Sequence, residues 1–192
     1  GVQAVPITYG HYLLAYEESF ERDQQRVSEA YHRLNLSPMG TGVLSNSIWP
    51  LNRKRLATLL GFDGIVENSM ASSQVIPFDN QLEASAIASS SAIRIGAMMQ
   101  DLHTQYAQVK PWLLLQEGST YTSSAMPQKR NPGLIMQARM AASDVVGLSE
   151  AVIIRTHNVP SGMVDYKSET ADLGLFPHAI KMVDATKRVF DA

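Results

Sequence analysis

The chain has 192 residues, of which 45% are hydrophobic and 18% are charged, a composition typical of a globular domain with a substantial core. The net charge of -2 gives no electrostatic case for binding nucleic acid or an anionic membrane. The lack of cysteine excludes disulfides, thiolate nucleophiles and zinc–thiolate sites, and no apolar run approaches the roughly 20 residues of a membrane span. We therefore expect a cytoplasmic protein with neither a nucleic acid nor a membrane partner.

The first third of the chain is expected to hold two helices. Apolar residues recur with a helical period over Tyr12–Leu34, with an interruption near Gln24. A connection rich in proline and glycine follows, and a short helix is expected over Asn52–Leu60, ending at Gly61. The charged side chains of the first helix are expected to form a solvated, salt-bridged face, comprising Glu17, Glu18, Glu21, Arg22, Asp23 and Arg26.

Three longer helices are expected in the rest of the chain. The first is predicted over Asp79–Leu115, with Asp79 as its N-cap, and Pro111 should kink or end it. The second should begin at Pro132 with Asn131 as its cap, and the last should fill Leu173–Ala192. No segment of useful length alternates with period two. The chain is therefore predicted to be all-α, a single domain over residues 1–192 built as a bundle of long helices.

Two of the predicted helices are rich in alanine, serine and glycine, in the stretches EASAIASSSAIRIGAMM and QARMAASDVVG. Small side chains allow helix axes to approach closely, and some of them lie away from the apolar stripe. We expect these helices to be buried by more than one neighbour, which indicates an oligomer, with Met98 and Met99 in the core. The alternative is that small residues are simply tolerated at positions facing solvent.

The segment SSAMPQKRNP, residues 123–132, is the strongest candidate for chemistry. Lys129 brings a positive charge and Asn131 an amide beside the free backbone N–H groups of a helix N-terminus, a combination suited to binding a carboxylate. The residues alone also allow a polar linker with an incidental lysine. The G-x-S-x-G elbow, the P-loop and the dinucleotide-binding pattern are absent from the chain.

The stretch TSSAMPQKRNP closely resembles the signature loop of the fumarase/aspartase superfamily, Gly-Ser-Ser-x-Met-Pro-x-Lys-x-Asn-Pro. Every fixed position matches except the leading glycine, where this chain has Thr122. Gln128 is similar to the argininosuccinate lyase branch, whereas adenylosuccinate lyases usually have histidine there. The stretches AVPITYGHYLLAYEESFERD, LSPMGTGVL and LGFDGIVENSM resemble further blocks of the same branch, so the resemblance covers most of the chain.

The resemblance implies an enzyme that eliminates an amine or alcohol from a succinyl group and releases fumarate without a cofactor. The spacing of the five histidines, with no i, i+4 pair and no carboxylate at ligand spacing, predicts that there is no metal site. In this family Ser123 would be the general base, a role for which serine needs its oxyanion stabilised. Lys129 and Asn131 would stabilise the charge that builds on the substrate carboxylate, and Ser124 could donate a hydrogen bond to it. Thr122 and Gln128 complete the expected substrate-binding set. The segment Gly118–Gln128 is expected to be a mobile lid.

Several positions depart from the argininosuccinate lyase pattern. A glutamate of that pattern corresponds to Met136, and the aspartate after its last proline corresponds to Gly133. The residues that hold the arginine part have no clear counterpart, since Met163, Ser168 and Ala171 align there, and Val2 replaces a conserved glutamine. We therefore expect the leaving-group half of the site to differ, with argininosuccinate itself not a substrate and the released amine unidentified.

The resemblance also implies a homotetramer whose active sites each draw on three subunits. Residues near Gln3 and Thr8 would serve one site and the Ser123 loop another. A conserved Thr-His region of the family lies upstream of the first residues of this chain, so we expect the chain to be a fragment of a longer one.

Three readings of the function stay open. The first is a C–N lyase acting on an N-substituted aspartate. The second is an adenylosuccinate lyase or a carboxymuconate cycloisomerase-like member, for which Gln128 is a mismatch. The third is a non-catalytic relative like the lens crystallin recruited from this fold, and the intact Ser123, Lys129 and Asn131 favour an enzyme over it.

Overall fold

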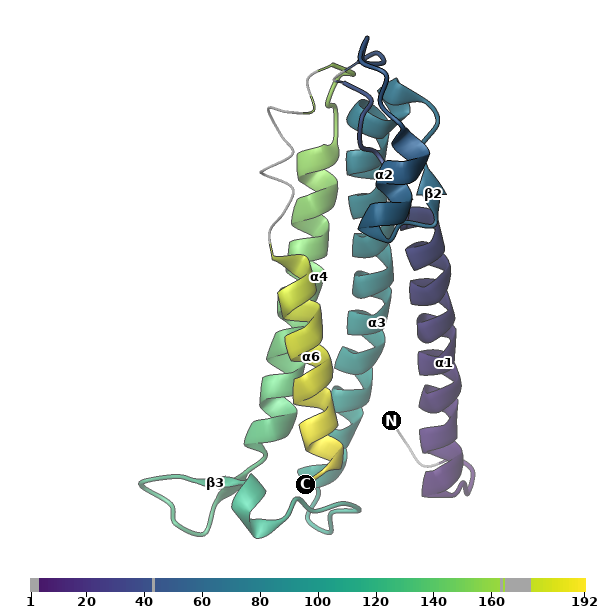
Figure 1. Cartoon of the computed structure of the whole chain (residues 1–192). Helices are drawn as coiled ribbons and strands as arrows, with labels where there is room; N and C mark the ends of the chain where they lie inside the picture. The colour runs from purple at the N-terminus through teal and green to yellow at the C-terminus, as the bar shows by residue number, and fades with distance from the viewer. Residues whose placement is uncertain (1–3, 43, 163, 165–173) are drawn as a thin grey trace.

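Long helices lie side by side in an elongated bundle in the computed structural model, which describes residues 4–42, 44–162, 164 and 174–192 (Figure 1). They are α1 (Tyr9–Leu34), α3 (Ile76–Tyr106), α4 (Gly133–Thr156) and α6 (Leu175–Phe190). The short helix α2 (Arg53–Leu60) lies at the end of the bundle away from the chain's C-terminus. The predicted all-α bundle is confirmed.

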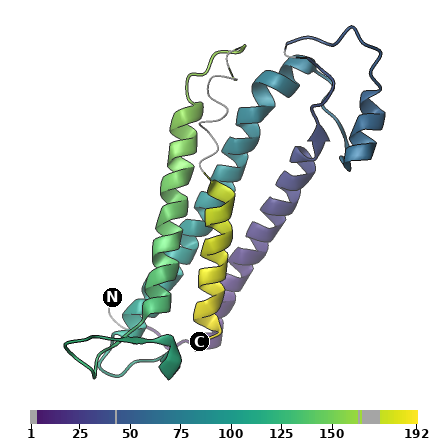
Figure 2. The same ribbon diagram turned by 60° about the vertical axis from the view of Figure 1, so that its left-hand side comes forward.

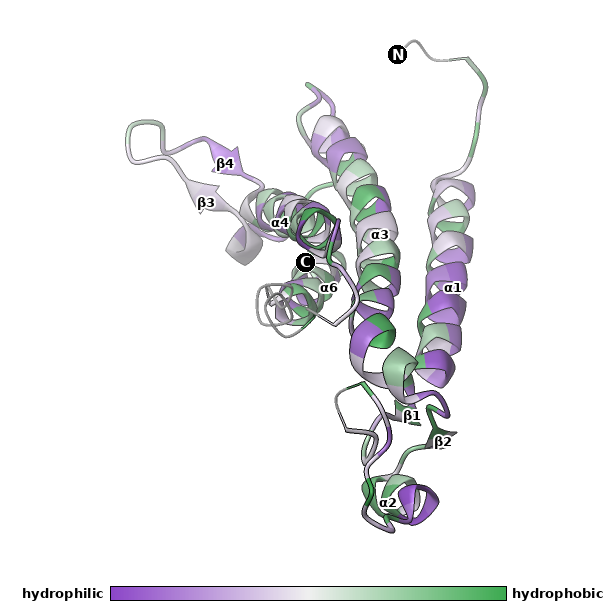
Figure 3. Ribbon diagram, turned by 90° about the horizontal axis from the view of Figure 1, so that it is seen from above, coloured by the Kyte–Doolittle hydropathy of each residue, from purple (hydrophilic) through white to green (hydrophobic). Residues whose placement is uncertain are grey.

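The helix α3 lies at the centre of this arrangement. It packs along most of α4, and α4 in turn packs along α6 (Figure 2). Viewed along the bundle, α4 and α6 lie on one side of α3 and α1 lies on the other (Figure 3). The core between α3, α4 and α6 includes Met98 and Met99, which are 1% and 0% exposed. The prediction that both methionines are core residues is therefore confirmed.

Small side chains line the contact between α3 and α4. A Cβ added to Gly96 would lie 3.9 Å from the Cβ of Ala142, which shows how closely the two helices approach. The buried small residues are Ser85, Ala92, Ala138, Ala141, Ala142 and Ser149. Burial is confirmed at these positions, whereas the oligomer inferred from the small residues stays a prediction.

The ends of the first two helices follow local capping chemistry. Thr8 caps α1, because its Oγ1 accepts a hydrogen bond from the backbone N–H of His11 at 3.1 Å. The helix then runs without a break through Gln24, so the predicted interruption is wrong. The predicted ends of α2 are confirmed, since Asn52 accepts a hydrogen bond from the N–H of Arg55 and Gly61 has the left-handed φ of 79°.

The predicted ends of α3 are wrong at both sides. The chain becomes helical upstream of α3, in a π-helical turn over Ala71–Val75, where Asn68 Oδ1 accepts a hydrogen bond from the N–H of Ala71 at 2.9 Å. Proline is tolerated in the first turn of α3 because the N–H it lacks has no partner there, and Asp79 lies within that turn rather than capping it. The helix ends at Tyr106, well before Pro111, and leaves room for the chain to turn back.

Very short strands complete the described part of the fold. Leu36–Ser37 (β1) pairs in parallel with Gly64–Ile65 (β2), and Tyr121–Thr122 (β3) pairs antiparallel with Arg130–Asn131 (β4). Two residues are too few to show a period-two pattern in the sequence, so neither pair was predicted. Within the described ranges no helix is long and apolar enough to span a bilayer, and no cluster of three or more histidine and carboxylate side chains is placed to hold a metal ion.

The prediction of a solvated, salt-bridged charged face on α1 is wrong at Asp23 as to solvation, although Asp23 does form an ion pair with Arg26. Asp23 is only 8% exposed and faces α3, where Arg94 donates to its carboxylate, while Arg26 donates from the same helix at 2.7 Å. Burial alone would raise the pKa of Asp23, but hydrogen bonds from Ser91 and the two arginines together outweigh it and hold the pKa below its usual value. This carboxylate therefore stabilises the contact between α1 and α3.

Asp23→Asn is expected to lower the free energy of unfolding by about 1–3 kcal/mol at neutral pH, because it removes the negative charge that strengthens the hydrogen bonds from Arg26 and Arg94. A depressed pKa contributes stability above the unfolded-state pKa of about 3.9 and loses it as the pH falls through the folded-state value. The difference between variant and wild type should therefore shrink below about pH 4. Urea unfolding of both proteins across pH 3–7 measures it, with exposed Glu18→Gln on the same helix as the control. A constant difference down to pH 3 would contradict the assignment.

Candidate active site

The signature segment forms a hairpin between α3 and α4. Its two strands pair Tyr121 with Asn131 and Thr122 with Arg130, so residues 123–129 form the loop at its tip. A turn within the tip is closed by the backbone N–H of Lys129, which donates to the carbonyl of Met126 at 2.9 Å. The hairpin projects from the end of the bundle where α4 begins (Figure 1).

This hairpin brings all six predicted site residues into one short segment. Ser123 and Asn131 are half-buried, whereas the others are exposed, namely Thr122, Ser124, Gln128 and Lys129. The side chains of Ser123 and Ser124 have no hydrogen-bond partner among the described residues. Both hydroxyls are therefore free to contact a ligand.

The two neighbouring cations of the loop have different surroundings. Arg130 pairs with Glu117, its Nη2 lying 2.6 Å from the Oε1 of that carboxylate. This hydrogen bond, with the charge of Arg130, holds the pKa of Glu117 below its usual value. Lys129 has no ion-pair partner within the described part of the chain. Of the two, Lys129 is the cation with its charge available to a bound anion.

Asn131 does not cap the following helix, contrary to the prediction. Its Nδ2 donates to the carbonyl of Tyr121 at 3.2 Å, across the hairpin, and Pro132 occupies the N-cap position of α4. Proline has no side-chain acceptor, so the first N–H groups of α4 receive no side-chain cap. Because the N-cap residue supplies no side-chain acceptor, these N–H groups are available beside the hairpin, as the carboxylate-site hypothesis requires.

Tyr106, the last residue of α3, fixes the second strand of the hairpin. Its hydroxyl donates to the carbonyl of Arg130 at 3.0 Å, and its half-buried ring packs against the core. The ion pair of Glu117 with Arg130 ties the same strand to the segment before the hairpin. Sequence reasoning missed both contacts, since neither residue belongs to the signature.

Of the N-terminal residues expected at a second site, the structure describes Thr8 alone. Thr8 caps α1, as described above, and Gln3 lies outside the described residues, as do Val2, Met163, Ser168 and Ala171. Close to Thr8, Tyr12 and Tyr16 both donate to Asp101 Oδ2, at 3.1 and 3.3 Å. Burial raises the pKa of Tyr12, and the neighbouring Tyr16 and Asp101 raise it further. These tyrosines stay protonated and join α1 to α3.

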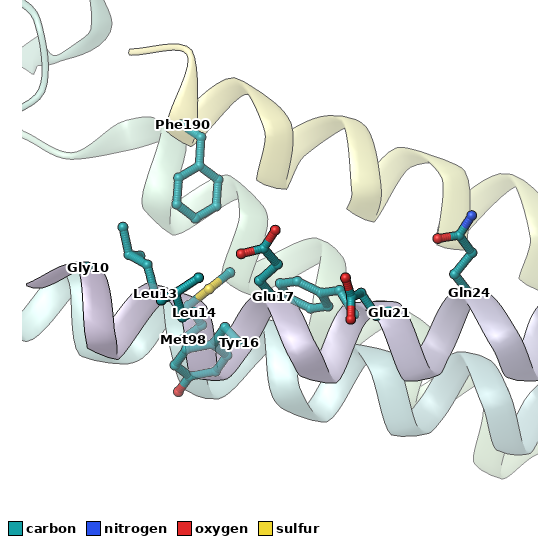
Figure 4. A pocket seen from close by; sticks show the side chains of 10 residues that line it. Gly10, Leu13, Leu14, Tyr16, Glu17, Glu21, Gln24, Met98 and Phe190 are labelled. Atoms are coloured by element: carbon teal, nitrogen blue, oxygen red, sulfur yellow. The ribbon is translucent and has the colours of Figure 1, made fainter.

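A large apolar groove lies between α1 and the C-terminal end of α6. Its volume is about 720 Å³, and Leu13, Leu14 and Phe190 line it together with Met98 below (Figure 4). Carboxylates on α1 stand at its rim, and none of the six predicted site residues lines it. The groove is therefore separate from the signature hairpin.

Comparison with known proteins decides the family. Residues 1–147, well over half of the chain, match the family described as lyase. The chain belongs to this lyase family. It is 35% identical over 150 residues to an argininosuccinate lyase of Methanosphaerula palustris, covering 78% of this chain and 30% of the relative. It is 32% identical over 188 residues to that of Geobacillus thermodenitrificans, covering 98% and 40%. The chain thus spans less than half the length of these relatives.

Solved structures of the fumarase/aspartase superfamily share the fold. A variant of EDDS lyase with bound fumarate matches with a TM-score of 0.78 and 29% identity. The match covers 96% of this chain and 38% of the EDDS lyase chain. A class II fumarase from Schistosoma mansoni has a TM-score of 0.80 at 16% identity, over 95% and 43% of the two chains, and at that identity supports the fold alone. The predicted membership of the superfamily, in the argininosuccinate lyase-like branch, is confirmed.

Proposed function

We propose that this protein is a carbon–nitrogen lyase that eliminates an amine from an N-substituted aspartate and releases fumarate. The observation that carries the proposal is the hairpin of residues 121–131. It presents two serines, a lysine and an asparagine in the order of the superfamily signature, and neither serine hydroxyl nor the lysine side chain has a partner among the described residues. The relatives support it, because they include argininosuccinate lyases and an EDDS lyase with bound fumarate. No cofactor takes part in this scheme.

In the proposed mechanism Ser123 Oγ removes the proton from the carbon next to a substrate carboxylate. The electron pair of that C–H bond moves into the carboxylate, which then carries additional negative charge. The positive charge of Lys129, the amide of Asn131 and the uncapped N–H groups of α4 stabilise this charge. The bond between carbon and the protonated nitrogen of the substrate then breaks, and its electron pair leaves with the neutral amine. The electron pair held in the carboxylate returns to form the double bond of fumarate.

The remaining members of the predicted site have supporting roles in this proposal. Ser124 donates a hydrogen bond to the same carboxylate, and Thr122 and Gln128 contact the substrate from the two sides of the loop. The three are exposed, so a bound substrate or a neighbouring subunit has access to them.

Formation of fumarate from a panel of substrates tests the proposal. The full-length protein is incubated with N-substituted aspartates, including argininosuccinate and adenylosuccinate, and fumarate is followed by its ultraviolet absorbance. We expect fumarate from at least one member but not from argininosuccinate, since Met136 and Gly133 replace carboxylates of that branch. Fumarate from adenylosuccinate, or lactone formation from carboxymuconate, would favour the second reading. No product from any substrate would favour a structural, crystallin-like role.

We also propose that the loop at the tip of the hairpin closes over bound substrate. The paired strands hold Tyr121 and Thr122, so the moving part is residues 123–129 rather than the whole of Gly118–Gln128. Closure would exclude water while negative charge develops on the substrate. Amide hydrogen exchange of residues 123–129 is expected to slow when fumarate saturates the full-length protein. Unchanged exchange at saturation would contradict closure.

Finally, we propose that the protein assembles as a homotetramer. Outward faces of the long helices carry large apolar side chains, and on α6 Phe176, Ile180 and Val183 are 65%, 63% and 56% exposed. Apolar faces of this extent are typical of interaction surfaces. Within a tetramer, residues of neighbouring chains could complete the open site on the hairpin.

Light scattering is expected to give four times the mass of one full-length chain. Ile180→Asp should shift the protein to smaller species, because it places a charge on the apolar face of α6. Lys181→Asp, at the next exposed position, is the matched control and should leave the assembly intact. A wild-type protein that stays monomeric at micromolar concentration would refute the tetramer.

A further inference from the structure

Tyr121 and Gly133 approach each other closely where the hairpin meets α4. A Cβ added to Gly133 would lie 2.7 Å from Cδ1 and 3.0 Å from Cε1 of the Tyr121 ring. Such distances are shorter than any ordinary contact of a Cβ atom, so glycine leaves the space that the ring occupies. Gly133 does not have the left-handed backbone that requires glycine at other positions of this chain. The close approach of the ring is therefore the reason for a glycine here.

The other contacts of Tyr121 tie it to both strands of the hairpin and to α4. Its hydroxyl points to Met136 Sδ at 3.9 Å, a weak acceptor one helical turn beyond Gly133 on the same face. Its backbone pairs with Asn131, whose side chain also donates to its carbonyl at 3.2 Å. The ring of Tyr121 thus packs β3 against the first turn of α4.

We propose that Tyr121 is a positioning residue for Ser123, and that Gly133 provides the space in which the ring of Tyr121 packs. The inference rests on the proposed function, in which Ser123 is the base. Tyr121 precedes Ser123 by two residues, and its ring sets how far the serine lies from the uncapped N–H groups of α4. The chain departs from the aspartate of the argininosuccinate branch at position 133 because any side chain there would displace the ring.

The sign of the effect of Gly133→Ala distinguishes this proposal from an ordinary helix effect. Alanine forms helices more readily than glycine, so the substitution should stabilise α4 wherever space allows. Gly147, on the same helix, has no atom of the described residues within 4 Å of an added Cβ, and Gly147→Ala is the matched control. It should raise the melting temperature slightly and leave activity unchanged. Gly133→Ala should instead lower the melting temperature, because the added methyl group would displace the ring of Tyr121.

The experiment compares Gly133→Ala, Tyr121→Ala, the double variant and Tyr121→Phe in the full-length protein. Each of the first two should lower kcat by about 10–100-fold, the scale expected from misplacing a reacting group by about 1 Å, with a much smaller change in KM. Tyr121→Phe keeps the ring and should stay near wild type. The double variant should be no slower than Tyr121→Ala alone, because the added methyl group then has no ring to displace.

Hydrogen exchange gives a readout that does not depend on turnover. Exchange at residues 122–129 should be faster in Gly133→Ala and in Tyr121→Ala, and unchanged in Gly147→Ala. The role of Tyr121 would be overturned if the fold decrease in kcat of the double variant equalled the product of the two single decreases. It would also be overturned if hydrogen exchange were unchanged in both single variants. A wild-type protein that forms no fumarate from any substrate would overturn the proposed function instead. The exchange data would then test by themselves whether the packing of Tyr121 against Gly133 positions the loop.

Discussion

Ser123→Ala is expected to abolish fumarate formation by the full-length protein while leaving substrate affinity largely intact. The hydroxyl matters mainly when the proton moves, and loss of a general base typically lowers the rate by about 10²–10⁴-fold. Single-turnover kinetics measures the chemical step, and equilibrium binding of a slow substrate measures affinity. The melting temperature should not change, because the side chain has no hydrogen-bond partner among the described residues.

Ser124→Ala is the matched control, since Ser124 lies one residue away on the same loop and also has a free hydroxyl. It should reduce the rate less than Ser123→Ala, because in the proposed mechanism it removes one hydrogen bond to the carboxylate and not the base. If Ser124→Ala were inactive and Ser123→Ala nearly normal, Ser124 rather than Ser123 would be the general base. Full activity in both variants would exclude a serine base altogether.

Lys129→Met is expected to damage both binding and turnover. In the proposed mechanism the cation attracts the substrate carboxylate in the ground state and stabilises the greater charge of the transition state, so KM should rise and kcat should fall. Removal of one such electrostatic stabiliser typically costs about 10²–10³-fold in rate. Steady-state kinetics of the full-length protein across substrate concentrations separates the two effects.

Arg130→Met provides a control with the same change in net charge at the next position. The charge of Arg130 is already paired with Glu117, in an exposed ion pair of small energy, so its loss should affect kcat/KM much less. Equal losses in the two variants would show that the overall charge of the loop matters rather than Lys129 itself. No loss in Lys129→Met would exclude its carboxylate-binding role.

Particular residues show how far the sequence alone reaches for the site. The order of serine, lysine and asparagine in residues 123–131 was sufficient to find the segment and its family, because the signature is continuous along the chain. The partners that hold this segment were not predictable, because Tyr106 and Glu117 meet Arg130 only through the folding of three separate segments. Asn131 looked like a helix cap because it precedes Pro132, but its amide donates across the hairpin instead.

The sequence by itself determined the helical period, the extent of α2 between Asn52 and Gly61, the buried methionines and membership of the lyase family. These features depend on local spacing and short-range capping, which the order of residues contains directly. Tertiary structure decided that Asp23 faces α3 rather than solvent, and that Gly133 leaves the space that the ring of Tyr121 occupies. Both depend on contacts between residues 12 to 71 positions apart, and such contacts exist only once the helices and the hairpin have packed.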